Sequence, residues 1–251
     1  MAGWLLRAIA GFLALLLILP ACRAADELLI VTEELPPYNF TDQGSLTGLS
    51  TEVVQAVLHQ LDLTARFKVM PWARAYELAQ SAPNVLIYSI TRTRQREPRF
   101  KWVGSVAPED IYLFSSAQHP VVVHRLQEAS RYTVATVYED VGDQYLRSLG
   151  FTVGKNLQPS AAYQLNYQKL KAGRVDLWVM NLLVAQYLAR REGDDPQQVL
   201  YPSLHLTEIS GDYYMAFSPQ TPDALVERFR KGLLAIKQNG TFDRIKAKWL
   251  M

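Results

Sequence analysis

The chain has very little of what disulfides and metal centres are made from. Its 251 residues include one cysteine, Cys22, so no disulfide forms within the chain. The four histidines are scattered, with no pair at one-turn helical spacing: His59, His119, His124 and His205. Zinc and related ions need several ligands at short, regular spacing. The sequence therefore predicts no metal site.

Signatures of catalysis and of nucleic-acid binding are also missing. There is no Gly-x-Ser-x-Gly, no phosphate-binding loop and no Gly-x-Gly-x-x-Gly. Basic residues cluster only in 92–101, and a run of this kind is typical of a solvated face, so we expect no nucleic-acid partner. We expect no cofactor and no catalytic set, although two acid pairs in loops, Glu33-Glu34 and Glu139-Asp140, are candidate proton donors.

The chain has one long hydrophobic run, at its N-terminus. Arg7 precedes twelve apolar residues, Ala8 to Leu19. This run is too short to cross a bilayer comfortably and is typical of a secretory signal peptide. We assign residues 1–24 to the signal peptide and expect a periplasmic protein. Two cleavage sites remain open: a cut after Ala24, or a cut before Cys22 that leaves a lipidated N-terminus.

The most informative stretch is 85–96. It begins as an apolar, partly β-branched run that is typical of a buried strand. Ser89 and Thr91 stand two apart at its end, and Thr93 is a suitable N-cap for a helical turn that carries Arg96. At the carboxyl edge of an α/β sheet, hydroxyls, free amide N–H groups and a guanidinium converge on one small anion. The stretch predicts an anion site; alternatively, Arg96 is one more member of the solvated basic run.

Two further segments bring side chains to the same edge. Glu27 to Thr32 is typical of a strand, and Pro36-Pro37 takes the chain out of the sheet, which places Glu33 and Tyr38 at the carboxyl end of that strand. Trp72 follows the next expected strand, in a loop that leads into a helix. It is either a core aromatic or a ligand-facing one.

Strands and helices alternate along the remainder of the chain. Expected strands include 132–137, 175–180 and 212–217, and Asn181 precedes a helix that runs to about residue 191. This alternation predicts an α/β fold with mixed sheets flanked by helices.

The motifs together resemble a known family. A Ser/Thr-x-Ser/Thr pair on a strand end with an arginine five residues later occurs here as Ser89, Thr91 and Arg96. Gly-Thr-Phe-Asp-x-Ile at 240–245 is similar to the C-terminal signature of the same family. The chain thus resembles the bacterial extracytoplasmic solute-binding proteins of family 3, which serve the uptake of polar amino acids.

The resemblance implies the two-lobed type II periplasmic binding protein fold, with two hinge crossings. We expect one lobe from residues 26–115 plus 215–251 and the other from 116–214. It also implies a small-molecule ligand, a monomer, and the permease of an ABC transporter as partner.

The resemblance weakens in the second lobe. Family members carry a Gly-Ser/Thr pair where this chain has Glu139-Asp140, and an aspartate for the ligand's ammonium where it has Asn181. In the first lobe, Glu52 replaces the usual aspartate. The alternative readings are that Asn181 is simply a helix N-cap and that Glu139 and Asp140 face water.

The resemblance also implies roles within the cleft. Arg96 is expected to bind the ligand's carboxylate, with hydrogen bonds from Ser89 and Thr91. The rest of the predicted ligand-binding set is Tyr38 and Trp72 around the apolar part, and Glu33, Asp140 and Asn181 as polar walls. Two rival functions share this cleft: a cyclohexadienyl dehydratase-like enzyme, with Glu139 or Glu33 as proton donor, and a ligand-binding sensory module.

Overall fold

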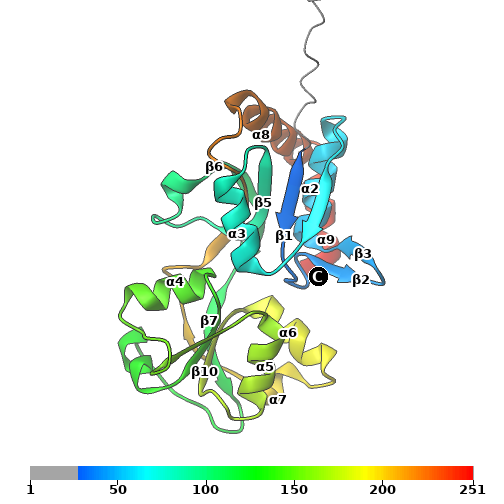
Figure 1. The fold of residues 1–251 in the computed structure, drawn as a ribbon. Helices are drawn as coiled ribbons and strands as arrows, with labels where there is room; N and C mark the ends of the chain where they lie inside the picture. Colours follow the sequence, from blue (N-terminus) through cyan, green and yellow to red (C-terminus); the bar gives the residue numbers. More distant parts are fainter. Residues whose placement is uncertain (1–27, 251) are drawn as a thin grey trace, which may run out of the picture.

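Each half of the molecule is built on one five-stranded sheet (Figure 1). The computed structural model describes residues 28–250, so the predicted signal peptide and Cys22 lie outside the described residues. Of the helices described, none is long and apolar enough to cross a membrane.

The first lobe surrounds the strand that carries Ser89 and Thr91. All seven residues of that strand are buried, as expected for the middle of a sheet. The sheet runs in the order β4 (Arg66–Val69), β1 (Leu29–Thr32), β5 (Val85–Thr91), β12 (Gly211–Phe217) and β6 (Lys101–Glu109). Its helices are α2 (Leu49–Gln60), α3 (Trp72–Ser81), α8 (Asp223–Gln238) and α9 (Thr241–Leu250). Helices α2, α8 and α9 pack against one another, while α3 packs against β1 and β5.

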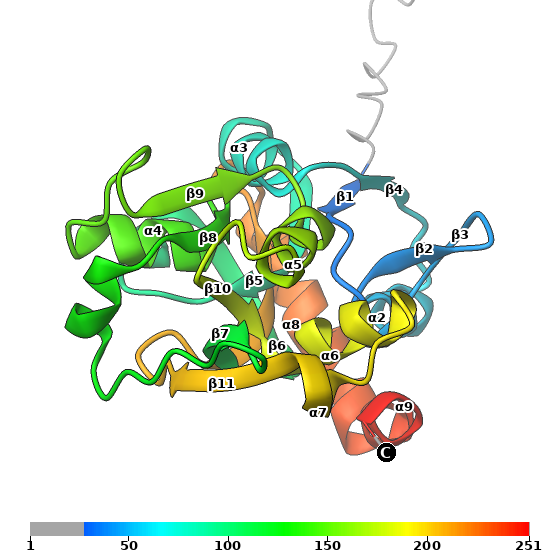
Figure 2. The same ribbon diagram turned by 90° about the horizontal axis from the view of Figure 1, so that it is seen from below.

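The second lobe repeats the design with other segments (Figure 2). Its sheet runs in the order β11 (Leu200–His205), β7 (Ile111–Ser116), β10 (Leu177–Asn181), β8 (Val134–Val137) and β9 (Leu157–Ser160). Its α-helices are α4 (Val141–Ser148), α5 (Tyr163–Lys171), α6 (Leu182–Arg191) and α7 (Pro196–Val199). The smaller elements of the molecule are β2 (Phe40–Asp42), β3 (Ser45–Thr47) and two 3-10 helices, Glu97–Arg99 and Leu126–Arg131.

The chain passes between the sheets twice, at Asp110 and at 206–210. The sequence placed these crossings near residues 115 and 215. The difference arises because one residue separates β6 from β7, so both strands read as a single extended segment. Strand β7 pairs with β10 and β11, and it therefore belongs to the sheet of the second lobe.

Strand direction brings the predicted site residues together. In the first sheet β1 and β5 are parallel, and β6 runs the same way because both β5 and β6 are antiparallel to β12. The carboxyl ends of these three strands face the second lobe, where β8 and β10 are also parallel to each other. Polar side chains at strand ends thus meet between the lobes, as at the carboxyl edge of other α/β sheets.

Gly48, at the start of α2, offers a test of how the Tyr38 loop is held. Its φ of 115° is unfavourable for other residues, and a Cβ there would lie 2.5 Å from the carbonyl oxygen of Tyr38. That oxygen accepts hydrogen bonds from the N–H groups of Ser50 and Thr51. Gly48→Ala should therefore lower the free energy of unfolding by about 2–4 kcal/mol, measured by urea denaturation.

Gly44→Ala is the matched control. Gly44 also has a positive φ, of 82°, but nothing lies within 4 Å of a Cβ built there. This variant should lose only about 1 kcal/mol. Equal losses in the two variants would show that the contact with Tyr38 is unimportant.

Candidate functional site

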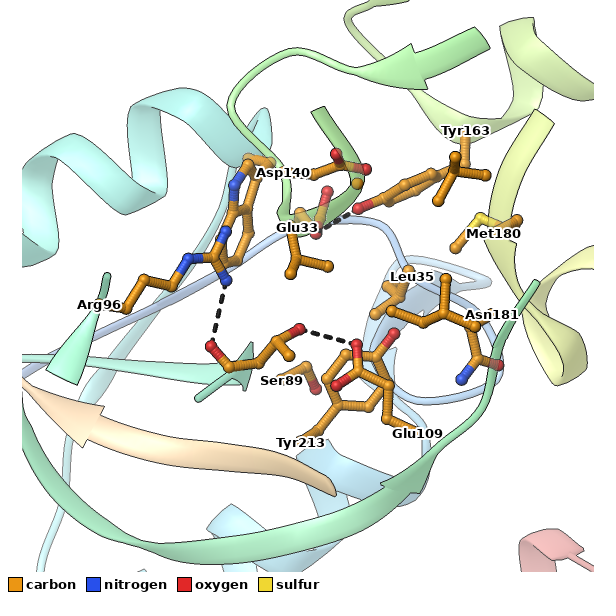
Figure 3. Close-up of a pocket in the computed structure, with 16 residues that line it drawn as sticks. Glu33, Leu35, Ser89, Arg96, Glu109, Asp140, Tyr163, Met180, Asn181 and Tyr213 are labelled. Atoms are coloured by element: carbon orange, nitrogen blue, oxygen red, sulfur yellow. Dashed lines mark hydrogen bonds between the residues drawn. The ribbon is translucent and has the colours of Figure 1, made fainter. Parts of the chain in front are cut away.

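A pocket lies between the two lobes and is lined by both (Figure 3). The first lobe contributes Glu33, Leu35, Trp72, Ser89, Thr91, Arg96, Glu109 and Tyr213. The second lobe contributes Ile111, Asp140, Val141, Gly142, Tyr163, Val179, Met180 and Asn181. Of the eight predicted ligand-binding residues, the pocket gathers seven and leaves out Tyr38.

Arg96 is buried, with 1% of its surface exposed. Its Nε donates to Oε1 of Gln144 at 3.0 Å, and its Nη1 donates to the carbonyl oxygen of Thr91 at 3.2 Å. The guanidinium carbon lies 5.3 Å and 5.1 Å from the ring centroids of Trp72 and Tyr76, within range of cation–π attraction. Its Nη2 is buried and has no hydrogen-bond partner among residues 28–250. The predicted anion-binding residue thus points inward, not into the solvated run.

The backbone around Arg96 follows the prediction in part. The carbonyl of Thr93 accepts hydrogen bonds from the N–H groups of Arg96 and Glu97, and its hydroxyl lies 3.3 Å from the N–H of Arg96. The helix that follows is a single 3-10 turn that begins at Glu97, with Arg96 itself at the N-cap position. The turn holds Arg96 at the strand end and leaves its side chain free to reach across the cleft.

Three buried carboxyl groups share the pocket with this guanidinium. Burial raises the pKa of Glu33 well above its usual range, and the charge of Asp140 raises it further. Burial raises the pKa of Glu109 to about 8 and that of Asp140 to about 7. Burial also lowers the pKa of Arg96, an effect opposed by the rings and acids around it. Near pH 7, Glu109 is therefore largely protonated in the free protein and Asp140 is about half protonated.

The acids differ in how fully their oxygens are used. Asp140 is the N-cap of α4: it accepts from the N–H of Asp143 at 2.7 Å and from the N–H of Val137 at 3.4 Å. Glu33 accepts from the hydroxyl of Tyr163 at 3.1 Å. Glu109 accepts from the hydroxyl of Thr91 at 2.7 Å through Oε1, whereas its buried Oε2 has no partner within the described part of the chain.

Asn181 lies on the opposite wall and serves as the N-cap of α6. Its Oδ1 accepts from the N–H groups of Leu183 and Val184, at 2.9 Å and 3.3 Å. The capping role predicted from the sequence is therefore present. Its Nδ2 is buried and unpartnered in the portion of the chain that the structure covers. Asn181 therefore offers the pocket a hydrogen-bond donor, whereas an aspartate at this position would offer an acceptor.

The hydroxyls of Ser89 and Thr91 donate within the protein. Ser89 has a positive φ of 56° and donates to Oδ1 of Asn39, and Thr91 donates to Glu109. Their oxygens line the pocket as acceptors.

Trp72 lines the pocket and Tyr38 stands behind it. Trp72 stacks on Tyr76 at a centroid distance of 5.6 Å and donates from Nε1 to the carbonyl of Glu139 at 2.7 Å. The Tyr38 hydroxyl lies 2.9 Å from the carbonyl oxygen of Pro108 and 3.3 Å from Oδ1 of Asn181. The expectation that Tyr38 encloses the ligand is not met by its position, because its hydroxyl and ring are used to hold the wall of the pocket.

Within residues 28–250, four hydrogen bonds that involve a side chain cross the cleft. They join Glu33 to Tyr163, Trp72 to the Glu139 carbonyl, Arg96 to Gln144, and Tyr38 to Asn181. The predicted proton donor Glu139 does not line the pocket; its carboxylate accepts from Nε2 of Gln144 at 3.1 Å. Each of these bonds needs the lobes to be together, so the structure is a closed form.

No group of histidine, cysteine, aspartate or glutamate side chains in residues 28–250 is arranged to hold a metal ion.

Comparison with known proteins decides which family uses this arrangement. The model of bacterial extracellular solute-binding proteins, family 3, matches residues 28–251. The chain belongs to this family. The relatives of this family 3 protein include an arginine-binding periplasmic protein of Mannheimia haemolytica, 24% identical over 230 residues, with 90% of this chain and 92% of that protein covered. A probable amino-acid ABC transporter-binding protein of Haemophilus influenzae is 25% identical over 232 residues, covering 88% of this chain and 84% of that protein.

Solved structures agree on the fold. An ancestral arginine-binding protein bound to arginine superposes with a TM-score of 0.78 at 21% identity, covering 90% of this chain and 98% of that one. A histidine kinase sensor domain with similarity to periplasmic binding proteins gives 0.77 at 22% identity, covering 90% and 96%. The predicted family and the type II periplasmic binding protein fold are confirmed.

Sequence reasoning missed three contributors to the site of this family 3 protein. Glu109 stands at the end of β6, where the chain leaves the first lobe, and Tyr163 is the first residue of α5. Gln144, which binds Arg96 from α4, carries no signal in its own segment. Only Glu109 had a usable clue: it is an acid at the end of an otherwise largely apolar strand.

The buried acids predict an unusual dependence of stability on pH. Folding moves the pKa of Glu109 from 4.5 to about 8 and that of Asp140 from 3.8 to about 7, so between pH 5 and 8 the folded state binds more protons than the unfolded state. The free energy of unfolding of the free protein should then fall as pH rises through this window. Glu109→Gln should make the fall shallower, by an amount on the order of 1–4 kcal/mol across the window.

Urea denaturation at pH 5.5, 7.0 and 8.5 measures this slope. Glu97→Gln is the control, because the ion pair with Arg92 lowers the pKa of the exposed Glu97 and its titration falls below the window. An unchanged slope in Glu109→Gln would mean that this carboxyl is ionised throughout.

Proposed function

We propose that this protein captures a small polar ligand that bears a carboxylate, an amino acid or a related compound, and delivers it to the permease of an ABC importer. The observation that carries the proposal is Arg96, which lines the pocket (Figure 3) and whose buried Nη2 has no hydrogen-bond partner among the described residues. A buried donor left unpaired is costly, and a guanidinium forms strong, often bidentate hydrogen bonds with carboxylate and phosphate groups. Family membership and the names of the relatives support amino-acid binding.

The proposed contacts follow the lining of the pocket. Arg96 binds the carboxylate, the face of Trp72 covers apolar ligand atoms, and the oxygens of Ser89 and Thr91 accept hydrogen bonds. Glu33, Asp140 and Asn181 form the polar wall on the other side, while Tyr38 acts from behind by fixing Asn181.

Capture would proceed by closure of the lobes about the two crossing segments. The bond from Arg96 to Gln144 and the bond from Trp72 to the Glu139 carbonyl form only when the second lobe arrives. Closure also removes water from around Arg96, which strengthens its attraction for a ligand anion. The closed form is the one we propose docks on the permease, as a monomer.

The family is extracellular by its description, which supports a periplasmic location. Removal of residues 1–24 and lipidation at Cys22 remain proposals about residues outside those described. A sensory role uses the same clamp, and a histidine kinase sensor domain shares the fold.

A dehydratase-like enzyme is the second candidate, because Glu33 places a buried carboxyl with a raised pKa in the same pocket as Arg96. The position of Glu139 outside the lining removes it from this role. Incubation with prephenate, followed by ultraviolet absorbance of the product, separates the candidates. Turnover that Glu33→Gln abolishes would replace the binding-only proposal.

Arg96→Gln tests the proposed function directly. The variant keeps a polar side chain but removes the guanidinium, so every carboxylate ligand should lose most of its affinity. In a thermal-shift screen of amino acids and small carboxylates, a ligand at a hundred times its dissociation constant stabilises the wild type by about 2.7 kcal/mol. We expect this stabilisation to disappear in the variant.

Arg94→Gln is the matched control, because Arg94 lies two residues away in the same basic run and is exposed. It should retain the full ligand-induced shift. An undiminished shift in Arg96→Gln would place the anion site elsewhere, and circular dichroism of both variants would establish that they are folded.

A further inference from the structure

The lining of the pocket is unbalanced in charge. It contains three carboxyl groups, Glu33, Glu109 and Asp140, and Arg96 is the one basic side chain among the described residues that line it. With every group ionised, the lining has a charge of three negative and one positive, or −2. Such a cluster is held in a buried site by protons or by a cationic partner.

Glu109 has an oxygen to spare. Both oxygens of Asp140 accept backbone N–H groups, whereas Glu33 and Glu109 each accept one hydroxyl, Glu33 that of Tyr163. Oε1 of Glu109 receives the Thr91 hydroxyl, but Oε2 is buried and unpartnered within residues 28–250. A buried carboxylate oxygen without a partner forms a strong hydrogen bond with a charged N–H donor, such as an ammonium group.

Glu109 and Arg96 are linked through one residue. The hydroxyl of Thr91 donates to Glu109, and the carbonyl of Thr91 accepts from Nη1 of Arg96. Arg96 and Glu109 therefore both contact Thr91, and both line the pocket. In an α-amino acid the carboxylate and the ammonium are attached to the same carbon. This short spacing suits a pocket in which Arg96 and Glu109 both contact one residue, Thr91.

Asn181 cannot serve in place of Glu109. Strand β10 pairs with β7 so that Asn181 lies opposite Ile111, two residues beyond Glu109, and the Tyr38 hydroxyl contacts both Asn181 and Pro108. The two side chains thus occupy one corner of the pocket. Oδ1 of Asn181 is used to cap α6, and only the donor Nδ2 is left. An ammonium group in this corner is accepted by Glu109.

We propose that Glu109 is the counter-charge for the ligand's α-ammonium group and that the ligand class is the basic amino acids. The inference rests on the proposed function, since it takes the ligand's carboxylate to lie on Arg96. With all its acids ionised, the pocket has a charge of −2, so a bound ligand of charge +1 brings the total to −1. One proton shared by Glu33 and Asp140 then makes the filled pocket neutral, whereas a zwitterionic ligand leaves the total at −2 and two protons are needed. The second cationic group of the ligand lies toward Glu33 and Asp140.

Isothermal titration with three related compounds tests the proposal. Lysine has both ammonium groups, norleucine lacks the one on the side chain, and 6-aminohexanoate lacks the α-ammonium. Wild-type protein should bind lysine at least about tenfold more tightly than either analogue, because each loses a hydrogen bond to a charged partner. Equal or tighter binding of norleucine would overturn the ligand class.

Glu109→Gln should lower the affinity for lysine at least about tenfold and leave the affinity for 6-aminohexanoate nearly unchanged, because of these two compounds only lysine has an α-ammonium group. Glu77→Gln is the matched control: it is also an acid-to-amide change in the first lobe, at an exposed side chain of α3 that does not line the pocket. It should bind all three compounds as the wild type does.

The outcomes separate this inference from the proposed function. Equal weakening of lysine and 6-aminohexanoate in Glu109→Gln would show a merely structural role, and unchanged lysine binding would exclude the contact; either result overturns the inference alone. If the wild type binds no amino acid or carboxylate in a manner that needs Arg96, the proposed function itself fails.

Discussion

The closed cleft depends on one buried guanidinium. Taking the charge of Arg96 out of water is costly, and a single hydrogen bond to each lobe compensates for only part of that cost. The faces of Trp72 and Tyr76 and the nearby acids supply further attraction. Arg96 donates one of its hydrogen bonds to Gln144 on the opposite lobe, so the conditions that stabilise the charge are complete only when the lobes meet. Anion binding and closure are therefore coupled through the same side chain.

The acids around Arg96 extend this coupling to protons. Glu109 and Asp140 have pKa values of about 8 and 7, which means that near neutral pH they are partly or largely protonated in the free pocket. A cationic group that binds there competes with those protons, because it stabilises the ionised form of the same carboxylates. Binding of a cation would release protons, whereas binding of a neutral compound would leave them in place. The pocket can thus discriminate by charge without a separate steric filter.

The sequence predicted the parts of the site that are local. The end of β5, with Ser89, Thr91 and Arg96, could be predicted because the whole pattern, a buried strand followed by polar residues, lies within the twelve residues 85–96. The lobes' α/β character followed from the alternation of periodicities. Contacts across the cleft could not be predicted in this way: Gln144 and Tyr163 lie on helices of the other lobe, and only the packing of two sheets brings them to Arg96 and Glu33. For Tyr38 the sequence predicted a loop at the end of β1, but it could not predict that the side chain lies behind the pocket lining, with its hydroxyl beside Pro108 and Asn181.

Asn181 and Asp140 each cap a helix while lining the pocket. The capping role was the alternative predicted for Asn181, whereas the alternative for Asp140, that it faces water, is wrong because its side chain is buried. A cap uses acceptor oxygens, so the residue offers the pocket only the polar atoms that the cap leaves. For Asn181 this is the donor Nδ2, and both oxygens of Asp140 are already engaged. The capping roles thus leave Glu33 and Glu109 as the acids able to accept a new donor.

The position of Glu109 has a consequence for the order of events in binding. It ends β6, which belongs to the same sheet as β5, and Thr91 holds it beside Arg96. If the counter-charge stood on position 181, an open protein would hold the ligand's carboxylate on one lobe and await its ammonium partner on the other. With Glu109 in that role, the α-carboxylate and the α-ammonium of the ligand both engage the first lobe before closure. The second lobe then adds Gln144, Tyr163 and the capped ends of α4 and α6, and closure becomes a step that excludes water from an ion pair already formed.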